Sequence, residues 1–425
     1  HKKQKHILRP SNNAKNTRDN DRNEGGKVSS YILILTHNFP PDIGAASFRM
    51  EALVRELSKR GHKVKVITAT PNRYSKMDIS FDDDFGQNVE VIRVKNVKQS
   101  GNYVKRSYSY IEYFIKTLFL AKSKIRHIDI IIATSPQILT GYLGALLKKK
   151  NIPFILDIRD LWPDAMVSLN LTTENSFIYK ILKKIEIYMY KKATRIIINS
   201  PAFKKDINKY VDKKIDLITN GLDDYFFNFF SKESPREIKN GDKIKIVYAG
   251  NLGIAQDIKI LTEIDEKISE NFIFKLIGDG SQKEEIEKTI KKKNINNIML
   301  YPPKARRELI EDYQNADAFF VHLKKLPMFE KTIPSKIFEY VATKKPVVYG
   351  LQGVAKDIMD ELNGGYSFEP GNVKSLEAAL IKMKNDLETG KWKYENNSIL
   401  EEKYLRSQLS KKFANIIEET LNDYN

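Results

Sequence analysis

The sequence predicts an α/β protein made of two doubly wound domains that face a cleft. At 425 residues the chain is long enough for two domains of ordinary size, each with its own apolar core. Short apolar runs, which are typical of buried parallel strands, alternate with segments of helical period in two successive series. Polar and glycine-containing stretches follow the strands of both series, and proteins of this class bind ligands at the carboxyl ends of their strands.

The composition is typical of a globular protein, with 41% hydrophobic and 30% charged residues. The absence of cysteine excludes a disulfide framework and a thiolate metal site. No apolar run reaches the about 18 residues that a transmembrane helix needs, and no signal peptide is visible. The net charge of +18 and the pI near 9.5 indicate an acidic partner, namely a phospholipid surface, a phosphorylated substrate or nucleic acid, unless the many lysines reflect compositional bias.

The first series follows residues 1–30, a polar stretch without apolar period that we interpret as a disordered tail. Residues 31–36 are predicted to form a buried strand, which helix 48–59 and a second strand extend to a βαβ unit. In the first turn of this unit, Gly44 permits close approach of the backbone to a ligand phosphate, although the GxGxxG pattern is absent. His37 lies at the carboxyl end of the strand, where it is a functional candidate or a structural histidine.

Charged side chains cluster directly after the predicted strand 154–158. Arg159 is suited there to bind a phosphate or a sugar hydroxyl, and Asp160 or Asp164 is suited to bind the hydroxyl of an acceptor. The alternative interpretation is a structural lattice of arginine and aspartate side chains.

Residues 103–124 interleave Tyr, Phe, Ile and Leu with Lys and Arg. As a helix this segment has a broad apolar face flanked by cations, which suits the interface of a membrane with anionic headgroups. The alternative is a helix that packs in the core of the first domain.

The second series begins after residues 223–243, which break the pattern and are interpreted as a linker. Its last part contains a buried strand at 318–322, a short helix opened by Pro334 and a strand at 346–349. The start of this helix is a candidate anion site, because its free N–H groups and its dipole favour negative charge. Thr332 is suited to cap the helix.

Glu339 follows Pro334 by more than one helical turn, where its carboxylate is placed to hold the vicinal hydroxyls of a ribose. An anion site beside such a carboxylate is what a pocket for a nucleotide sugar needs. The alternative is an ordinary surface helix on which Glu339 is solvated.

The order of these patterns resembles that of the GT-B glycosyltransferases of family 4, which are retaining enzymes. The resemblance runs from about residue 31 to the C-terminus, and it is closest to the branch that builds bacterial capsule and O-antigen repeat units on a lipid carrier. Some members of that branch transfer N-acetylfucosamine from a UDP donor. The motifs that carry the resemblance are FPPDIGAASFRM, RGHKVKVIT, DIRDLWPD, ITNGLDDYFF, YAGNLGIAQD, FKLIGDGSQKEEIE and PSKIFEYVATKKPVV.

The resemblance implies the GT-B fold, with two Rossmann-like domains that face a cleft. Residues 31–222 are then the acceptor-side domain and residues 244–400 the domain that binds the nucleotide sugar. Residues 401–425 are expected to form a helix that packs back on the first domain.

Matched position by position, the resemblance also implies a set of site residues. Glu339 corresponds to the second Glu of the E-x7-E motif, which holds the donor ribose, and Arg159 stands where many relatives have a histidine that contacts the sugar. The implied catalytic residues are Arg159, Asp160 and Lys331, and the implied acceptor-side residues are His37 and Asp164. The implied donor-binding residues are Gly44, Asn251, Gln256, Gly278, Gly280, Ile333, Pro334, Lys336 and Glu339.

The chain departs from the family pattern at charged positions of the donor site. Lys331 stands where the first Glu of the E-x7-E motif is expected, a departure that is compatible with a deoxy sugar as the donor sugar. Asn251 and Gln256 stand where an Arg and a Lys usually hold the diphosphate, so Lys331, Lys336 or Arg159 is expected to supply positive charge. No DxD motif for a metal is evident, and neither a metal nor a cofactor is expected.

The sequence thus predicts a retaining glycosyltransferase that moves a sugar, with an N-acetylated deoxysugar as one candidate, from a UDP-sugar to a saccharide on a lipid carrier. We expect it to act in the synthesis of capsule or another surface polysaccharide. The expected location is the cytoplasm, at the inner face of the cell membrane, and residues 103–124 and the basic surface are expected to contact that membrane. Nucleic acid is not expected as a partner, because the charge is diffuse and no recognition motif is present. A sugar-nucleotide epimerase, a basic binding protein without activity and a catalytically silent scaffold are the alternatives.

Overall fold

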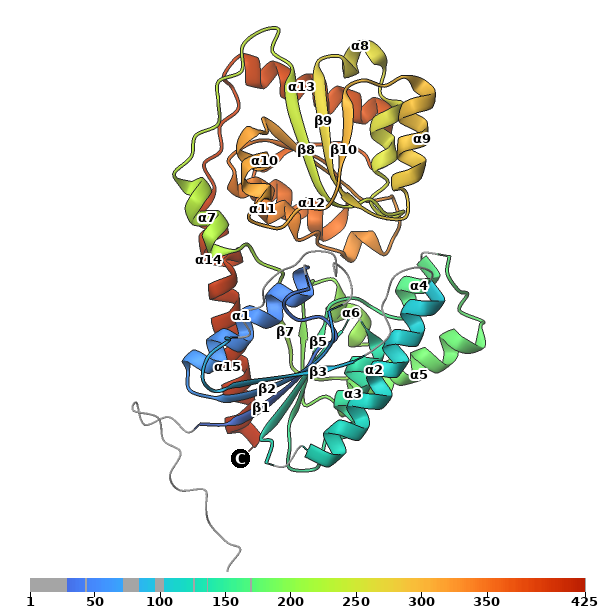
Figure 1. Cartoon of the computed structure of the whole chain (residues 1–425), viewed down its shortest axis with the longest axis vertical. Coiled ribbons are helices and arrows are strands. Elements are labelled where there is room, and N and C mark those ends of the chain that lie inside the picture. The colour runs from blue at the N-terminus through green and yellow to red at the C-terminus, as the bar shows by residue number, and fades with distance from the viewer. Residues whose placement is uncertain are drawn as a thin grey trace, which may run out of the picture.

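The computed structural model describes residues 29–42, 44–71, 84–95, 103–124, 127–135, 137–168 and 170–424. They form two α/β domains, one above the other in Figure 1, and each is built on a parallel sheet. The predicted tail of residues 1–30 lies outside the described residues except for its last two. Among the described residues, no helix has the length and apolarity needed to cross a membrane.

Within the described residues, the sheet of the first domain has seven strands in the order β3-β2-β1-β4-β5-β6-β7. The central strands β1, β4, β5 and β6 are almost wholly buried, because helices cover both faces of the sheet. The strand order reverses between β1 and β4, which places a crevice for a ligand at their carboxyl ends. The strands are β1 (Tyr31–Leu35), β2 (Lys63–Ala69), β3 (Val89–Val94), β4 (Ile130–Thr134), β5 (Phe154–Ile158), β6 (Arg195–Ile198) and β7 (Ile215–Leu217).

The sheet of the second domain has six strands in the order β10-β9-β8-β11-β12-β13. Here the order reverses between β8 and β11, so the second crevice lies at the carboxyl ends of these two strands. The predicted pair of doubly wound domains is therefore confirmed. The strands are β8 (Ile244–Asn251), β9 (Phe272–Asp279), β10 (Ile298–Tyr301), β11 (Ala318–His322), β12 (Val347–Gly350) and β13 (Gly365–Ser367).

Helices pack on both faces of each sheet, and the buried side chains form two apolar clusters in each domain. In β1, Leu33 and Leu35 belong to one cluster and Ile32 and Ile34 to the other, as the alternation of side chains along a strand requires. The helices of the first domain are α1 (Ala45–Lys59), α2 (Tyr103–Lys124), α3 (Ile138–Leu147), α4 (Asp164–Ser168), α5 (Phe177–Lys192), α6 (Phe203–Ile207) and α15 (Arg406–Tyr424). The remaining helices are α7 (Asp224–Ser231), α8 (Glu266–Ser269), α9 (Lys283–Lys293), α10 (Leu309–Asn315), α11 (Lys336–Ala342), α12 (Gly353–Glu361), α13 (Val373–Glu388) and α14 (Asn397–Tyr404), with 3-10 turns η1 (Ile258–Glu263) and η2 (Phe329–Lys331).

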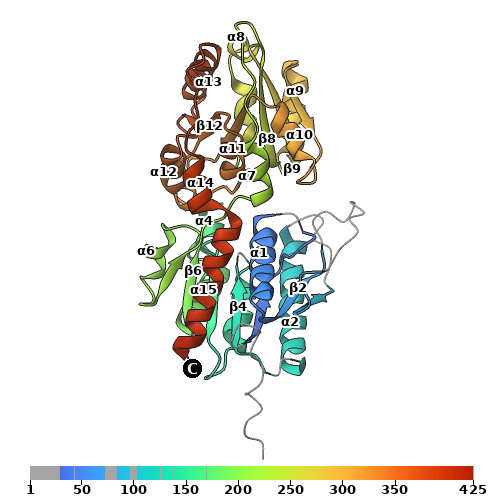
Figure 2. The same ribbon diagram turned by 90° about the vertical axis from the view of Figure 1, so that its left-hand side faces the viewer.

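The chain crosses between the domains twice, and the two crossings are joined to each other. Leu222 and Leu405 pair in a parallel bridge, in which the backbone N–H of Arg406 donates to the carbonyl of Leu222 at 2.7 Å. After the second crossing, α15 runs along the first domain beside α1 (Figure 2). Phe413 and Ile417 of α15 enter an apolar cluster of the first domain, so the C-terminal helix returns there, as predicted.

The elements β3, α7 and α10 differ from the prediction. β3 lies in a segment for which we predict no element, and it is the exposed edge strand of its sheet. The predicted linker of residues 223–243 contains α7, because its Phe226 is buried in the core of the second domain. The sequence pattern also predicts a helix over residues 306–314, but α10 begins only at Leu309, which leaves Arg306 in the preceding turn.

The helix α11 also begins later than predicted. Ser335 is its N-cap residue and Lys336 its first residue, so Pro334 does not open the helix. Thr332 does not cap it either, since the Thr332 hydroxyl donates to the carbonyl of Met328 at 3.3 Å. Both predictions are therefore wrong.

Candidate functional site

A cavity of about 240 Å³, which we call the interdomain cavity, lies between the two domains where β8 and β9 end. Gly44, Ala45 and Phe48 line it from the first domain. The second domain contributes the ends of both strands, the turn before α10 and the start of α11. The cavity therefore lies at the carboxyl edge of the second sheet, in the place that the topology predicts for a ligand.

Bare backbone forms one wall of this cavity. Gly250 and Gly278 stand opposite each other in the register of β8 and β9. A Cβ atom on Gly278 would overlap the carbonyl group of Gly250, and one on Gly250 would overlap the amine of Lys336. Glycine is thus required at Gly278, where the overlap is with backbone, whereas at Gly250 a Cβ atom would displace the flexible end of Lys336. The two glycines bring the backbone of both strands close to any ligand in the cavity.

Four basic side chains line the interdomain cavity, namely Lys304, Arg306, Lys336 and Arg406. Carboxylates hold three of them in ion pairs, whereas no described carboxylate forms an ion pair with Lys336. The Nζ atom of Lys336 lies 5.1 Å from the centre of the Tyr248 ring. Burial lowers the pKa of Lys336 to about 8, and the nearby Glu339 opposes this shift. Lys336 is therefore a cation that the fold leaves available to an anionic ligand.

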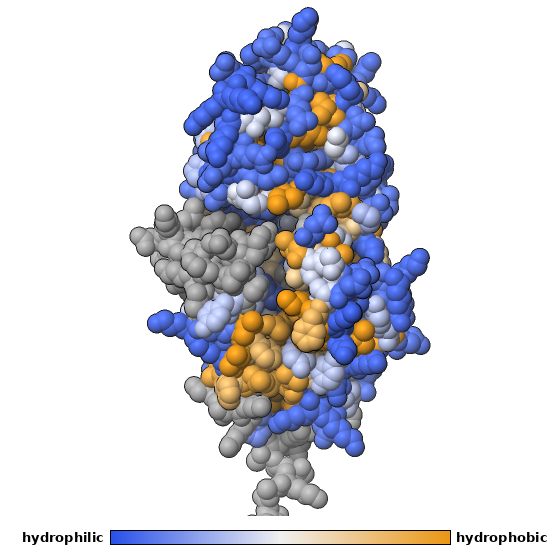
Figure 3. Space-filling view, turned by 90° about the vertical axis from the view of Figure 1, so that its right-hand side faces the viewer, coloured by the Kyte–Doolittle hydropathy of each residue, from blue (hydrophilic) through white to orange (hydrophobic). Residues whose placement is uncertain are grey.

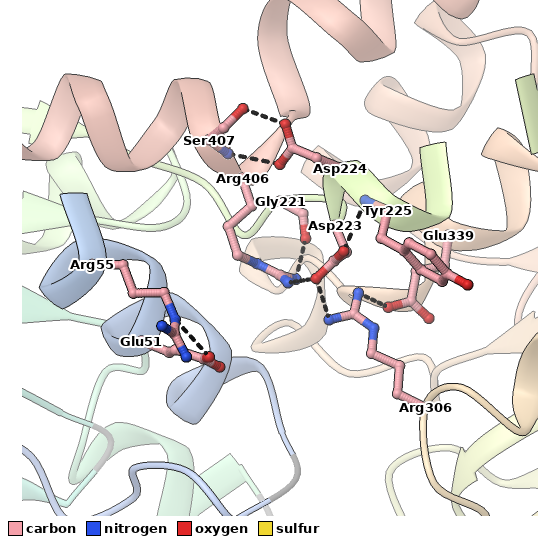
Figure 4. A network of polar contacts seen from close by, with 10 residues as sticks. All are labelled: Glu51, Arg55, Gly221, Asp223, Asp224, Tyr225, Arg306, Glu339, Arg406 and Ser407. Carbon is pink, nitrogen blue, oxygen red and sulfur yellow. Dashed lines mark hydrogen bonds and ion pairs between the residues drawn. The ribbon is translucent and has the colours of Figure 1, made fainter. Parts of the chain in front are cut away.

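Figure 4 shows the polar network around Arg306. Arg306 donates from Nη2 to Oε1 of Glu339 at 2.7 Å and from Nη1 to Oδ2 of Asp223 at 3.1 Å. Nη1 of Arg406 donates to the same oxygen of Asp223 at 2.9 Å. Both guanidinium groups lie over the ring of Phe48 in α1, with Cζ atoms 4.6 and 5.4 Å from its centroid. The network ties Glu339 to the crossing between the domains and to the start of α15.

A second cavity of about 280 Å³, which we call the first-domain cavity, shares Gly44 and Ala45 with the interdomain cavity. Its walls include Arg159 and Asp160, which follow β5, and Ile333 from the second domain. Because the two cavities share backbone at Gly44, ligands bound in them would be neighbours.

Arg159 is only 8% exposed. Nη2 donates to Oδ1 of Asn220 at 3.3 Å, whereas the buried Nε has no hydrogen-bond partner among the described residues. The nearby carboxylate of Asp157 is bound by Arg49 instead, at 2.8 and 3.1 Å. Burial, helped by the charge of Arg49, lowers the pKa of Arg159 to about 10.

The rest of the polar wall of the first-domain cavity carries carboxylates and amides. Burial raises the pKa of Asp160 to about 6, with Arg159 opposing the shift, so this carboxyl group is mostly ionised at neutral pH. Gln137 donates to Oδ1 of Asn38 at 3.0 Å, and Asn38 donates to Asp42 at 3.4 Å. Such groups are suited to bind the hydroxyls of a sugar.

The structure brings most of the predicted donor residues together. Three lie outside the lining of both cavities: Gln256 accepts a hydrogen bond from Nδ2 of Asn251 at 3.0 Å, Gly280 packs on the backbone of Leu252, and Pro334 precedes α11. The others line the interdomain cavity (Gly44, Asn251, Gly278, Lys336 and Glu339) or the first-domain cavity (Gly44 and Ile333, beside the predicted catalytic residues Arg159 and Asp160).

His37 is only 2% exposed and lies outside the lining of both cavities. Its ring packs edge-on against Tyr110 and Tyr113 of α2, at 4.9 and 5.1 Å between centroids. Burial lowers the pKa of His37 to about 4, so its imidazole is neutral at neutral pH. The structure thus places this predicted acceptor-side residue beneath the cavity wall that Tyr110 forms.

Asp164 and Lys331 also lie outside the two cavities. Asp164 accepts hydrogen bonds from Tyr179 at 2.7 Å and from Lys183 at 2.9 Å, both on α5. Lys331 forms an ion pair with Asp206 of α6, across the boundary between the domains. In this structure the Lys331 amine is therefore engaged in joining the domains.

Arg306 and Arg406 are among the cavity residues that have no place in the sequence-based prediction. Arg306 stands in a segment predicted as a helix, and Arg406 stands in the helical tail, far in sequence from the crossing at Asp223 that it contacts. The sequence does indicate that such residues exist, because the donor motifs lack positive charge and cations must therefore reach the site from other segments. Only the fold identifies these cations as Arg306 and Arg406.

Two family models match the chain, one in each half. The model described as "Glycosyltransferase Family 4" matches residues 46–225, and the model described as "Glycosyl transferases group 1" matches residues 229–397. The two matches meet within α7, beside the first crossing between the domains.

Curated proteins and solved structures show the same similarity. The chain is 24% identical over 378 residues to an uncharacterized glycosyltransferase of Methanocaldococcus jannaschii, covering 88% of this chain and 93% of that protein. It is 22% identical over 337 residues to WcaI of Escherichia coli, described as a putative colanic acid biosynthesis glycosyl transferase, covering 73% and 81%. The structure of HepE from Anabaena with UDP and glucose superimposes with a TM-score of 0.65 at 15% identity, covering 91% and 99%. This last similarity shows the fold.

Proposed function

Because the chain is a glycosyltransferase with the GT-B fold, in which a family 4 domain is joined to a group 1 domain, we propose that it transfers a sugar from a UDP-sugar with retention of configuration. The observation that carries the proposal is the interdomain cavity, where an unpaired lysine, two arginines and a carboxylate surround bare backbone. HepE, which shares the fold, is described in complex with UDP. The acceptor proposed is a saccharide on a lipid carrier.

The interdomain cavity is suited to the nucleotide. Lys336 and Arg306 are placed to neutralise the diphosphate, and the glycine backbone at Gly250 and Gly278 lets the ligand approach. Glu339 is proposed to hold the ribose. Its Oε1 is bound by Arg306, which fixes the carboxylate and leaves Oε2 for a ribose hydroxyl.

The first-domain cavity is proposed to hold the acceptor, next to the donor sugar at Gly44. The bond between the sugar carbon and the leaving phosphate oxygen breaks, and the acceptor hydroxyl forms the new bond on the same face. The proton of that hydroxyl passes to the leaving phosphate oxygen, so no protein nucleophile is required. Asp160 is proposed to orient the hydroxyl by accepting a hydrogen bond, and cations stabilise the charge on the leaving diphosphate.

The role proposed is the synthesis of a bacterial surface polysaccharide at a membrane. WcaI, to which the chain is similar, is described as acting in colanic acid biosynthesis. The helix α2, which contributes Tyr110 to the first-domain cavity, exposes apolar side chains at helical spacing. Figure 3 shows apolar side chains gathered on this face of the first domain. The exposed apolar side chains of α2 are Tyr108, Ile111, Ile115 and Phe119.

Calorimetric titration with UDP and with GDP tests the donor site. We expect UDP to bind the wild-type protein and Glu339→Ala to weaken this binding by tenfold or more, because the ribose loses its carboxylate partner. The matched control is Glu284→Ala, which removes an exposed carboxylate of α9 in the same domain. The proposal fails if neither nucleotide binds, and the role of Glu339 fails if both variants bind UDP equally. Release of UDP only in the presence of an acceptor separates the transferase from an epimerase.

Sedimentation with anionic liposomes tests the membrane contact. We expect the wild-type protein to co-sediment with the liposomes. The variant Ile115→Asp should not, because it places a charge in the middle of the exposed apolar side chains of α2. Ile381→Asp is the matched control, since Ile381 is an isoleucine of nearly equal exposure, 44% against 45%, on α13 of the second domain. Equal loss in both variants would show that the charge acts in general rather than through α2.

A further inference from the structure

We infer that the first-domain cavity is an anion site, in which Arg159 binds a carboxylate or phosphate group carried by a saccharide substrate. The inference rests on the proposed function and adds to it the chemical class of one substrate. It concerns the part of the substrate that lies beside Gly44 and Ile333, away from the nucleotide.

The first observation is a buried guanidinium without enough partners. Among the described residues, the hydrogen bond from Nη2 to Asn220, at 3.3 Å, is the one contact that holds the Arg159 side chain, and Nε is buried without a partner. Buried arginines are ordinarily paired or bidentate, because an unmet N–H group in a desolvated place costs free energy. A substrate anion is a suitable partner for the remaining N–H groups.

The second observation concerns the nearest carboxylates. Asp157, on β5 two residues before Arg159, is fully buried, but Arg49 binds both of its oxygens. Asp160 follows Arg159 directly, yet no ion pair joins the two side chains. Asp160 lowers the local positive charge without using the N–H groups of Arg159, so the guanidinium keeps its donors for a ligand.

The third observation separates this anion from the diphosphate of the donor. Lys336, Arg306 and Arg406 line the interdomain cavity, whereas Arg159 lines the first-domain cavity. The diphosphate therefore has cations of its own. A further cation, the buried Arg159, in the neighbouring cavity is consistent with a second negative group in the reacting complex.

The fourth observation is the rest of the cavity wall. Asn38, Asp42 and Gln137 stand around the same space as Arg159. Carboxylate and amide side chains bind sugar hydroxyls, and a single arginine among them selects one charged substituent. The wall as a whole thus suits a saccharide that carries one anionic group.

The anion has two chemically equivalent sources, a carboxylate on the transferred sugar or a phosphate on the acceptor. Two titrations separate them. In the first, UDP-glucuronate is compared with UDP-glucose. In the second, the protein is saturated with UDP, which fills the interdomain cavity, and α-glucose 1-phosphate is compared with methyl α-glucoside.

Both titrations are run on the wild type and on Arg159→Gln, Arg159→Lys and the control Arg55→Gln, whose arginine lies on the surface of α1. We expect the charged member of at least one pair to bind about tenfold or more tightly than the neutral member. Arg159→Gln is expected to remove this preference, Arg159→Lys to keep part of it, and Arg55→Gln to leave it unchanged. Melting temperatures show whether each variant still folds. If Arg159→Gln does not fold, Arg159→Lys, which keeps the positive charge, still tests the role of Arg159.

A preference between the two UDP-sugars places the anion on the transferred sugar, and a preference for glucose 1-phosphate places it on the acceptor. The inference is overturned if neither pair shows a preference, or if a preference survives in Arg159→Gln. The glucose 1-phosphate arm is repeated without UDP. A protein that does not bind UDP but prefers the charged sugar would contradict the proposed function while it supports the anion site.

Discussion

Replacement of Arg49 by methionine is expected to lower the free energy of unfolding of the first domain by about 3–5 kcal/mol. Arg49 on α1 binds both oxygens of Asp157 on β5, and their side chains are 7% and 0% exposed. Arg49 also donates to the carbonyl groups of Ile218 and Thr219, at 2.8 and 3.0 Å. Removal of the guanidinium leaves a buried carboxylate with the hydroxyl of Thr134 as its remaining partner.

Unfolding in urea, followed by circular dichroism, measures this loss. The matched control is Arg55→Met on the same helix, because Arg55 pairs with Glu51 on the surface, with 50% and 30% of the side chains exposed (Figure 4). An exposed pair contributes at most about 1 kcal/mol, so the control should change the midpoint little. The double variant Arg49→Met with Asp157→Leu should recover part of the loss, because it removes the unpaired charge as well. Equal effects of Arg49→Met and Arg55→Met would contradict the explanation.

Replacement of Lys336 by methionine is expected to weaken UDP binding about thirtyfold or more, since truncation of one partner of a desolvated charge pair costs about 2–5 kcal/mol. Lys336 is the basic side chain of the interdomain cavity that no described carboxylate holds in an ion pair. Its amine is therefore the one that a diphosphate engages without breaking a contact within the protein. Lys304→Met is the control, because Lys304 lines the same cavity but is paired with Asp312.

The same lysine predicts how UDP binding depends on pH. The pKa of Lys336 in the free protein is lowered to about 8, and a bound diphosphate raises it. The affinity for UDP is therefore highest below the pKa that Lys336 has in the UDP-free protein. It falls as the pH rises above that pKa, by up to about tenfold per pH unit. Calorimetry between about pH 7 and pH 9 checks this, a range that stays below the pKa of Arg406, which burial lowers to about 10.

Two variants identify the titrating group. Lys336→Arg should keep its charge and make UDP affinity nearly constant over this range. Lys336→Met should bind weakly with no fall above pH 8. A fall of the same size in all three proteins would assign the pH dependence to another group.

The two sheets could be predicted because buried parallel strands leave a strong signal in the sequence. Runs such as the one that forms β4 are apolar throughout and are read without knowledge of their partners. β3 was missed because an edge strand is half exposed and lacks such a run. The start of α11 was misplaced because Pro334 and Thr332 fit the rules for a helix start, while the tertiary structure holds both residues in the preceding turn.

The candidate site was predictable only where local sequence determines it. Gly278 lies at the end of β9 and Glu339 lies on α11, both within motifs that the sequence displays, and both line the interdomain cavity. Arg306 and Arg406 reach the cavity from a turn and from a helix that returns across the boundary, and no local pattern records that path. Lys331 shows the converse, since a position matched by motif is held by Asp206 of the other domain.

The return of α15 to the first domain has a consequence for the order in which a newly made chain folds. The ribosome delivers the whole second sheet before it delivers Phe413 and Ile417, which complete the apolar cluster beneath α1. The two crossings are separated by roughly 180 residues, which take roughly ten to forty seconds to synthesise. During that interval the nascent first half exposes the apolar groove that α15 will fill. The N-terminal domain is therefore completed last, and the apolar surface that α15 covers is the part of the nascent chain to which we expect a chaperone to bind.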